Sequence, residues 1–195
     1  MIISVNRKRL DKQTRMMKLN YYSSILLSVL LLIPFVGHGQ DKVLSDSVNA
    51  KLITGAREIM AAAGICTLIT LDEDGNARAR AMDAFSPDND FIVWFGTNPK
   101  SRKVNQIQHN PSVTLYYFDK ATASYVMIHG KAEIIDSQEE KGNHWKEAWQ
   151  NFYPDYPENY LLIKVTPEWM EVISEARGIS GDPLTWQPPI VWFKK

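Results

Sequence analysis

The sequence predicts a mainly β fold with flanking helices, arranged as an antiparallel barrel of six or seven strands. Short runs of β-branched and aromatic residues recur between turn residues from residue 65 to residue 173. Only two or three segments have apolar residues at helical spacing. The turns between these elements are short, and the 156 residues from 40 to 195 suit one domain with its own core.

A helix and a hairpin are expected first. Residues 44–62 carry apolar residues at helical spacing, and Gly64 ends the helix. Residues 65–71 form an apolar run typical of a strand. The Asp-Gly pair in the turn at residues 72–76 tolerates positive φ, so the chain is expected to return through a partner strand at 77–85.

The central part of the chain is expected to continue with a buried strand at residues 91–95 and a basic helix. Pro99 suits the first position of a helix over about residues 99–108, and Asn98 suits its cap. The Asn-Pro pair at residues 110–111 then breaks the chain.

The C-terminal part is expected to hold four more strands and one helix. Gly130 marks a bulge or bend in the longest of these strands. The four strands are expected at residues 113–118, 123–135, 160–165 and 169–173. The helix is expected at residues 137–152, with one aromatic face made of Trp145, Trp149 and Phe152.

Residues 1–39 are expected to form an export signal. They contain six basic residues, an apolar run from Ile25 to Val36 that is shorter than the roughly 20 residues of a membrane span, and a small-residue exit. Cleavage is expected after Gly39, which would place the protein in the periplasm or outside the cell. Met16 or Met17 could be the true start instead of Met1. The alternative is a membrane anchor that is never cleaved.

The remaining chain is acidic. Residues 1–39 contain six of the 22 basic and one of the 22 acidic residues, so residues 40–195 carry 16 basic and 21 acidic residues, a formal charge of −5. Such a surface favours neither nucleic acid nor an anionic membrane. Cys66 is the only cysteine, so no intrachain disulfide is possible, and its apolar surroundings predict a buried thiol.

A basic segment follows the strand expected at residues 91–95. Ser101, Arg102 and Lys103 add a hydroxyl and two cations to a helix start whose backbone N–H groups have no intrahelical partner. Such a segment can bind a phosphate dianion. The alternative, from spacing alone, is a solvated basic helix start.

The run T-N-x-x-S-R-K-x-x-Q-I-x-x-N-P-x-V-T-L, from Thr97 to Leu115, resembles the flavin-phosphate segment of the pyridoxamine 5'-phosphate oxidase family. Residues 125–133 resemble the family's next long strand, and residues 78–82 resemble the strand whose arginine also reaches the phosphate. The similarity covers about residues 60 to 174. It implies an FMN-binding split β-barrel that forms a homodimer with flavin at the subunit interface. The tail from Ser180 to Lys195 is expected to wrap a neighbour or stay loose.

The resemblance implies a set of FMN-binding residues. Alternation along the strand does not separate Arg78 from Arg80, but the Arg-x-Met pattern selects Arg80 for the phosphate, together with Arg102 and Lys103. Met82 is expected to face the isoalloxazine ring through its backbone. The full set comprises Arg80, Ala81, Met82, Gly96, Thr97, Ser101, Arg102, Lys103 and Tyr125.

Three departures from the family bear on the substrate. Phe85 replaces a lysine, Tyr125 replaces a glutamine that contacts flavin, and no Arg-x-His pattern occurs near the C-terminus. These departures argue against vitamin B6 oxidation, and the chain looks more like the bacterial general-stress flavin-binding relatives. The four histidines show no metal-ligand spacing, and no side chain qualifies as a catalytic acid or base.

The sequence therefore predicts an exported FMN-dependent oxidoreductase whose substrate and electron donor are unassigned. The alternative is a flavin- or haem-binding carrier or sensor without turnover. A third possibility, a barrel that has lost its cofactor and serves as an interaction protein, is disfavoured by the intact Ser101-Arg102-Lys103 segment.

Overall fold

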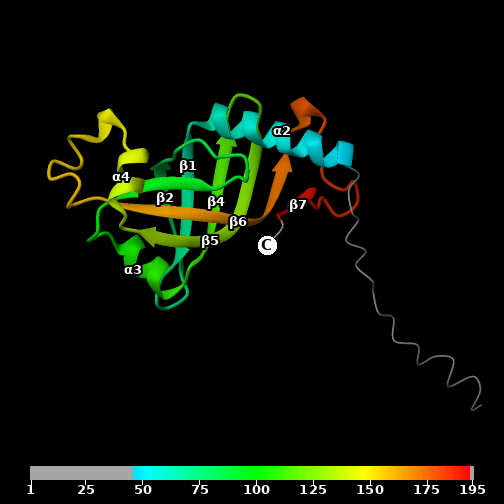
Figure 1. Ribbon diagram of the computed structural model, residues 1–195. Helices are drawn as coiled ribbons and strands as arrows, with labels where there is room; N and C mark the ends of the chain where they lie inside the picture. The colour runs from blue at the N-terminus through cyan, green and yellow to red at the C-terminus, as the bar shows by residue number, and fades with distance from the viewer. Residues whose placement is uncertain (1–45, 194–195) are drawn as a thin grey trace, which may run out of the picture. The chain divides into compact units, whose positions relative to one another are not determined.

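An antiparallel sheet of seven strands forms the centre of the fold (Figure 1). The computed structural model describes residues 46–193, which belong to a single unit that begins at Leu44. The expected export signal, residues 1–39, lies outside the described residues. The strands are β1 (Ile65–Leu71), β2 (Ala77–Asp83), β3 (Val93–Thr97), β4 (Ser112–Asp119), β5 (Ser124–Ile135), β6 (Leu161–Ile173) and β7 (Ile190–Trp192).

The strand order is β2-β1-β4-β5-β6-β3. Strands β3 and β7 share the second edge of β6, where β3 pairs with residues 161–165 and β7 with residues 169–171. The sheet is not closed, although its two ends meet at a bridge between Ala84 and Phe95. The prediction of a six- or seven-stranded antiparallel split barrel with flanking helices is confirmed, with seven strands among the described residues.

Side chains alternate between two faces of the sheet. The inner face carries the core, in which Cys66 and Leu68 of β1, Leu115 of β4 and Val126 and Ile128 of β5 are fully buried. The predicted burial of Cys66 is confirmed, and burial raises the pKa of its thiol to about 12. The opposite face has a mostly apolar area that we call the outer face, made of Ile65, Tyr116, Phe118, Tyr125, Met127, Trp169, Ile173, Ile190 and Trp192.

Helix α2 (Asp46–Ala63) packs against the inner side of the sheet (Figure 1). Its buried residues, Leu52, Ala56, Ile59 and Met60, join the main core. Gly64 ends the helix as expected, because it adopts a φ of 68° and donates its N–H to the carbonyl of Met60 at 3.3 Å. No described helix has both the length and the apolar character that crossing a membrane requires.

Helix α3 (Arg102–His109) begins later than predicted, with Ser101 as its cap residue. Pro99 lies in a turn before it. The carbonyl of Asn98 accepts the N–H of Ser101 at 3.0 Å, and its side-chain oxygen accepts the N–H of Lys100 at 2.8 Å. The side chain of Asn98 therefore closes a turn instead of capping a helix.

The two closing strands expected at residues 160–165 and 169–173 are one strand, β6. Pro167 does not break it, because it pairs with Gly130 at a register shift in β5. A Cβ on Gly130 would lie 2.3 Å from the carbonyl oxygen of Thr166, so the close approach of the two backbones requires glycine.

The predicted helix at residues 137–152 is also wrong. It divides into α4 (Gln138–Asn143) and a short 3-10 turn, η1 (Glu147–Trp149), and Phe152 is 74% exposed. Packing against Tyr160 holds Trp145 and Trp149 in place. A second 3-10 turn, η2 (Glu175–Arg177), follows β6. The tail then adds strand β7 to the chain's own sheet, with Trp169 opposite Trp192.

Candidate functional site

An open pocket of about 500 Å³ lies between β2 and the start of α3. We call it the basic pocket. Strand β2 contributes Arg80, Ala81 and Met82, and the turn before α3 and its first residues contribute Lys100, Ser101, Arg102 and Lys103. Six of the nine residues expected to bind FMN therefore line one pocket, and Lys100 joins them.

Arg80 is held in the pocket by neighbouring polar groups. Its Nη1 donates to Oγ1 of Thr70 at 2.9 Å, and its Nη2 donates to Oε1 of Gln106 at 3.1 Å. Thr70, which is buried, also donates to the same oxygen of Gln106 at 2.7 Å. These bonds fix the guanidinium between β1 and α3 before any ligand binds.

A second polar group links the end of β3 to the start of α3. The hydroxyl oxygens of Thr97 and Ser101 are 3.0 Å apart, and Nζ of Lys103 donates to Oγ1 of Thr97 at 3.1 Å. Thr97 is 1% exposed, so it does not line the pocket. It contacts Lys103 and Ser101 from the buried side.

The charge of the basic pocket is uncompensated within the described residues. No carboxylate forms an ion pair with Arg80, Arg102 or Lys103 in this part of the chain. Burial, and then the charge of Arg102, lowers the pKa of Arg80. Burial, and then the charge of Arg80, lowers the pKa of Lys103. Partly buried cations that repel one another favour an anionic ligand.

The structure separates Arg80 from Arg78. Arg78 pairs with Asp72 in the β1–β2 turn, with 2.6 Å between Nη2 and Oδ2, and its side chain is half exposed. Nη1 of Arg80 instead donates to the carbonyl of Leu68, which lies opposite Arg80 in the hairpin, and to Oγ1 of Thr70. These bonds hold the guanidinium at the pocket. The side-chain partners, Asp72 for Arg78 and Gln106 for Arg80, therefore supply the distinction that alternation could not.

Two expected residues lie elsewhere. Gly96 is covered by aromatic rings: a Cβ there would lie 2.5 Å from Cε2 of Tyr160 and 2.6 Å from Cζ3 of Trp149. Tyr125 lies on the outer face, three strands from β2, with its ring 5.6 Å from that of Tyr116. Neither residue therefore lines the basic pocket of its own chain, because aromatic rings cover Gly96 and the sheet separates Tyr125 from β2, and their contact with FMN stays a prediction.

Three residues were not foreseen as part of the site: Lys100 lines the pocket, and Thr70 and Gln106 hold Arg80 there. A signal existed for Gln106, which follows Lys103 by three positions and so shares its face of the helix. Thr70 becomes recognisable only when the hairpin register is known, because it lies two positions beyond Leu68, the residue opposite Arg80.

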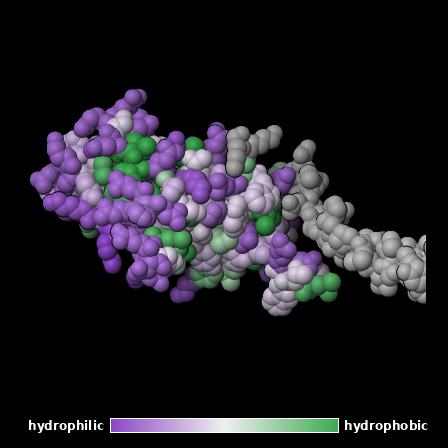
Figure 2. All heavy atoms as spheres, turned by 90° about the horizontal axis from the view of Figure 1, so that it is seen from below, coloured by the Kyte–Doolittle hydropathy of each residue, from purple (hydrophilic) through white to green (hydrophobic). Residues whose placement is uncertain are grey.

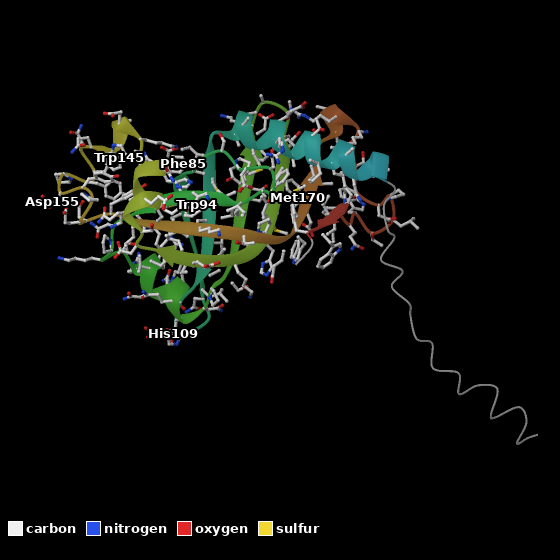
Figure 3. All side chains as sticks on the ribbon, in the orientation of Figure 1. Phe85, Trp94, His109, Trp145, Asp155 and Met170 are labelled. Atoms are coloured by element: carbon white, nitrogen blue, oxygen red, sulfur yellow. The ribbon has the colours of Figure 1, made fainter. Side chains whose placement is uncertain are left out.

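An aromatic cluster lies just beyond the end of β2, beside α4, where Phe85, Trp94 and Trp145 lie near one another (Figure 3). The ring of Phe85 contacts those of His144 and Trp149, at centroid distances of 5.2 and 5.4 Å.

One ion pair anchors this cluster to β2. Nζ of Lys146 donates to Oδ1 of Asp83 at 2.7 Å and to the carbonyl of Ala84 at 2.9 Å. Nε1 of Trp149 donates to the other oxygen of Asp83 at 2.8 Å. The lysine charge beside Phe85 is therefore already neutralised.

Comparison with known proteins identifies a family and a set of similar folds. The family model described as pyridoxamine 5'-phosphate oxidase like matches residues 53–178. A search of curated proteins found no match.

Among solved structures, general stress protein 26 from Bacillus anthracis str. Sterne is 22% identical, with a TM-score of 0.56 over 75% of this chain and 98% of that one. A protein related to general stress protein 26 from Clostridium acetobutylicum is 21% identical, with a TM-score of 0.61 over 73% and 94%. A pyridoxamine 5'-phosphate oxidase-related, FMN binding protein from Nostoc punctiforme PCC 73102 is 16% identical, with a TM-score of 0.52 over 77% and 97%. At these identities the structures show a shared fold.

Proposed function

Because the chain belongs to the pyridoxamine 5'-phosphate oxidase-like family, we propose that it binds FMN, with the flavin phosphate in the basic pocket. The observation that carries this proposal is the group of partly buried cations, Arg80 and Lys103, with Arg102 at the rim and no carboxylate paired to them among the described residues. The Nostoc punctiforme protein, which shares the fold, is an FMN binding protein.

Each pocket residue has a distinct part in holding the phosphate. The guanidinium of Arg80, oriented by Thr70 and Gln106, offers two parallel donors to phosphate oxygens. Lys103 supplies a point charge, and the hydroxyl of Ser101 supplies a donor. The N–H groups at the start of α3 add partial positive charge.

We further propose that the protein is an oxidoreductase. When bound, FMN supplies hydride and electron transfer through its ring, while the protein supplies binding, orientation and electrostatics. The chain's own contribution is to fix the phosphate end of the flavin beside β2. The ring would then lie along β2 near Met82. Phe85 takes the place of the family's lysine, and Lys146 beside it is paired with Asp83, which favours a substrate other than a vitamin B6 phosphate.

The proposed site is shared between two subunits of a homodimer. The basic pocket is open in one chain, and Tyr125 lies on the outer face, where it cannot reach the pocket of its own chain. The outer face exposes large apolar side chains, with Ile65 53%, Phe118 47% and Trp192 62% exposed. A second copy would cover them and bring its Tyr125 towards the flavin ring.

Binding without turnover is the second candidate function, as a carrier or sensor of flavin or haem. One observation favours it: among the described residues no histidine and no carboxylate lines the basic pocket, and its lysines and arginines are assigned to holding the phosphate as cations. In either case, residues 1–39 would direct the protein to the periplasm or outside the cell. After cleavage, residues 40–195 would have no stable membrane anchor. Their partner would be a small molecule.

A titration with two flavins tests the proposal. Residues 40–195, which include the whole described unit, should quench the fluorescence of FMN and bind riboflavin, which lacks the phosphate, at least about 10-fold more weakly. Equal affinities would show that the basic pocket does not recognise phosphate. A visible spectrum after addition of haem separates the remaining candidate, because haem binding without FMN binding would contradict the flavin proposal.

A further inference from the structure

A single carboxylate lies within the apolar outer face. Glu171 of β6 is half-buried there, opposite Met127 of β5 and Ile190 of β7. Among the described residues, no cation and no hydrogen-bond donor contacts its carboxylate. A carboxylate in such a place is costly to cover while it is charged.

The titratable groups around Glu171 are few. Burial, and then the charge of Glu171, raises the pKa of Tyr125 on β5, and Tyr116 lies next to Tyr125 on β4. Further along β5, Nε2 of His129 is 3.7 Å from Oε2 of Glu168, the unpaired residue of β6 at the register shift. Strand β7 contributes no titratable group to this face. Burial alone already raises the pKa of Glu171 in one chain.

Among the described residues, the chain itself covers only part of this side of the sheet. Over β3 and the first half of β6, the chain covers this side itself, with Trp149 and Tyr160 packed on Gly96 and Leu162. Over β1, β4, β5 and β7, no described element covers it. Seen from below, hydrophilic side chains surround hydrophobic patches at the end with α3 and α4, and the surface is paler towards β7 (Figure 2).

A second copy of the chain suits the uncovered area. In a two-fold dimer, each residue at the axis meets its own copy, so opposite charges cannot pair there. The outer face suits such an interface because it consists almost entirely of uncharged apolar groups. The exposed apolar residues lie on several adjacent strands and so form a continuous area, as dimer interfaces require.

We propose that Glu171 makes formation of the homodimer dependent on pH, with the protonated carboxyl favouring association. This inference rests on the homodimer of the proposed function. Covering the outer face removes water from a side chain that has no partner, so the dimer binds the proton more tightly than the monomer does. Association is therefore tightest at low pH, and it weakens as pH rises through the range in which the covered carboxyl loses its proton.

Sedimentation of residues 40–195 over a dilution series at pH 5, 6, 7 and 8 tests the inference. The dissociation constant should rise with pH by up to about 100-fold per pH unit, because each dimer contains two such carboxyls. If the dimer persists at the lowest concentration, the rate of subunit exchange between two labelled pools should show the same trend. Glu171→Gln resembles the protonated side chain and should dimerise tightly at every pH.

Two controls make the result specific. Glu158→Gln, at an exposed turn residue outside the outer face, should keep the wild-type pH dependence. Glu171→Leu, which tests whether the effect depends on the amide, should behave like Glu171→Gln. Circular dichroism checks the fold of each variant.

Two outcomes would overturn the inference. One is a wild-type pH dependence that persists in Glu171→Gln and disappears in Glu168→Gln, which would assign the effect to the contact between His129 and Glu168. The other is a monomer at every pH, which would also overturn the homodimer. Affinity for FMN, measured on the same samples, tests the cofactor proposal separately.

Discussion

Nη2 of Arg80 lies 3.1 Å from Oε1 of Gln106, and this hydrogen bond joins strand β2 to helix α3 at the basic pocket. The acceptor is a neutral amide that also accepts the hydroxyl of Thr70. An amide orients the guanidinium without neutralising it, whereas a carboxylate at the same place would remove the charge that an anionic ligand needs.

Changing Gln106 to glutamate should therefore close the pocket to phosphate. A carboxylate beside Arg80 would replace the ligand's charge-assisted bonds, each of which contributes about 1.5–3 kcal/mol, so FMN affinity should fall roughly 10- to 150-fold. The ligand-free protein should melt at a higher temperature, because the buried cations gain a partner. Fluorescence titration and thermal unfolding measure the two effects. Gln108→Glu, on the exposed side of the same helix, is the matched control, and equal losses in both variants would contradict the role of Gln106.

The two cations at the start of α3 should differ in their contribution. Lys103 is half-buried and held by Thr97, whereas Arg102 is exposed. Lys103→Ala should weaken FMN binding roughly 10- to 150-fold, as expected for a desolvated charge-assisted bond. Arg102→Ala should weaken it only about 2- to 5-fold, because exposed charge pairs contribute about 0.2–1 kcal/mol. Calorimetry gives both affinities, and a larger loss for Arg102 would show that burial does not set the order.

Much of the basic pocket could be predicted because its parts are close together in the sequence. Ser101, Arg102 and Lys103 are consecutive, and Thr97 precedes them by one turn, so local geometry alone brings them together. Strand β1 has the predicted bounds, since an apolar run and an Asp-Gly turn define a hairpin without help from the rest of the chain.

Other features depend on contacts between distant segments. The continuity of β6 past Pro167 depends on Gly130, which lies on another strand. The tight packing at Gly96 depends on Tyr160 and Trp149, more than 50 positions away. Sequence patterns indicate the secondary structure that each segment prefers, but not which distant segment will pack against it. In β6 and at Gly96, that packing determines the structure.

The lowered pKa of Lys103 predicts a limited pH range for FMN binding. Its pKa lies below the usual value of 10.5 because of burial and the charge of Arg80. A lysine whose folded pKa is depressed destabilises the folded state while charged, so the ligand-free protein should gain stability as pH rises from that pKa towards 10.5.

FMN affinity should change in the opposite direction. It should fall as Lys103 loses its proton at alkaline pH, and it should also fall below about pH 6, where the phosphate accepts its second proton. Titrations between pH 5 and pH 10 measure both limbs. The alkaline limb should disappear in Lys103→Ala, and an alkaline limb that persists unchanged in this variant would assign it to another group.

Gly96 should prove to be a packing residue. Gly96→Ala places a methyl group against the rings of Tyr160 and Trp149, and overpacking of this kind costs about 1–3 kcal/mol. Urea unfolding should show that loss, while the FMN affinity of the folded variant should stay within about twofold of wild type. Gly142→Ala in α4 is the matched control, because no atom beyond its chain neighbours and the backbone of its own helix lies within 4 Å of the added Cβ, and it should be neutral or stabilising. A loss of FMN affinity at unchanged stability would instead indicate that Gly96 contributes to the FMN site.

Mixing two defective variants should restore part of the proposed site if two chains share it. Arg80→Ala removes a phosphate ligand, and Tyr125→Ala removes an aromatic contact that contributes about 1–3 kcal/mol when a planar ring stacks on it. Each variant alone should bind FMN weakly. After subunit exchange, half of the dimers contain one chain of each kind, and one of their two sites combines the intact Arg80 of one chain with the intact Tyr125 of the other. A tight class of about one quarter of all sites should therefore appear only in the mixture. Fluorescence titration before and after exchange measures this class. If Arg80 and Tyr125 served a site within one chain, every site in the mixture would keep one defect, and no tight class would appear.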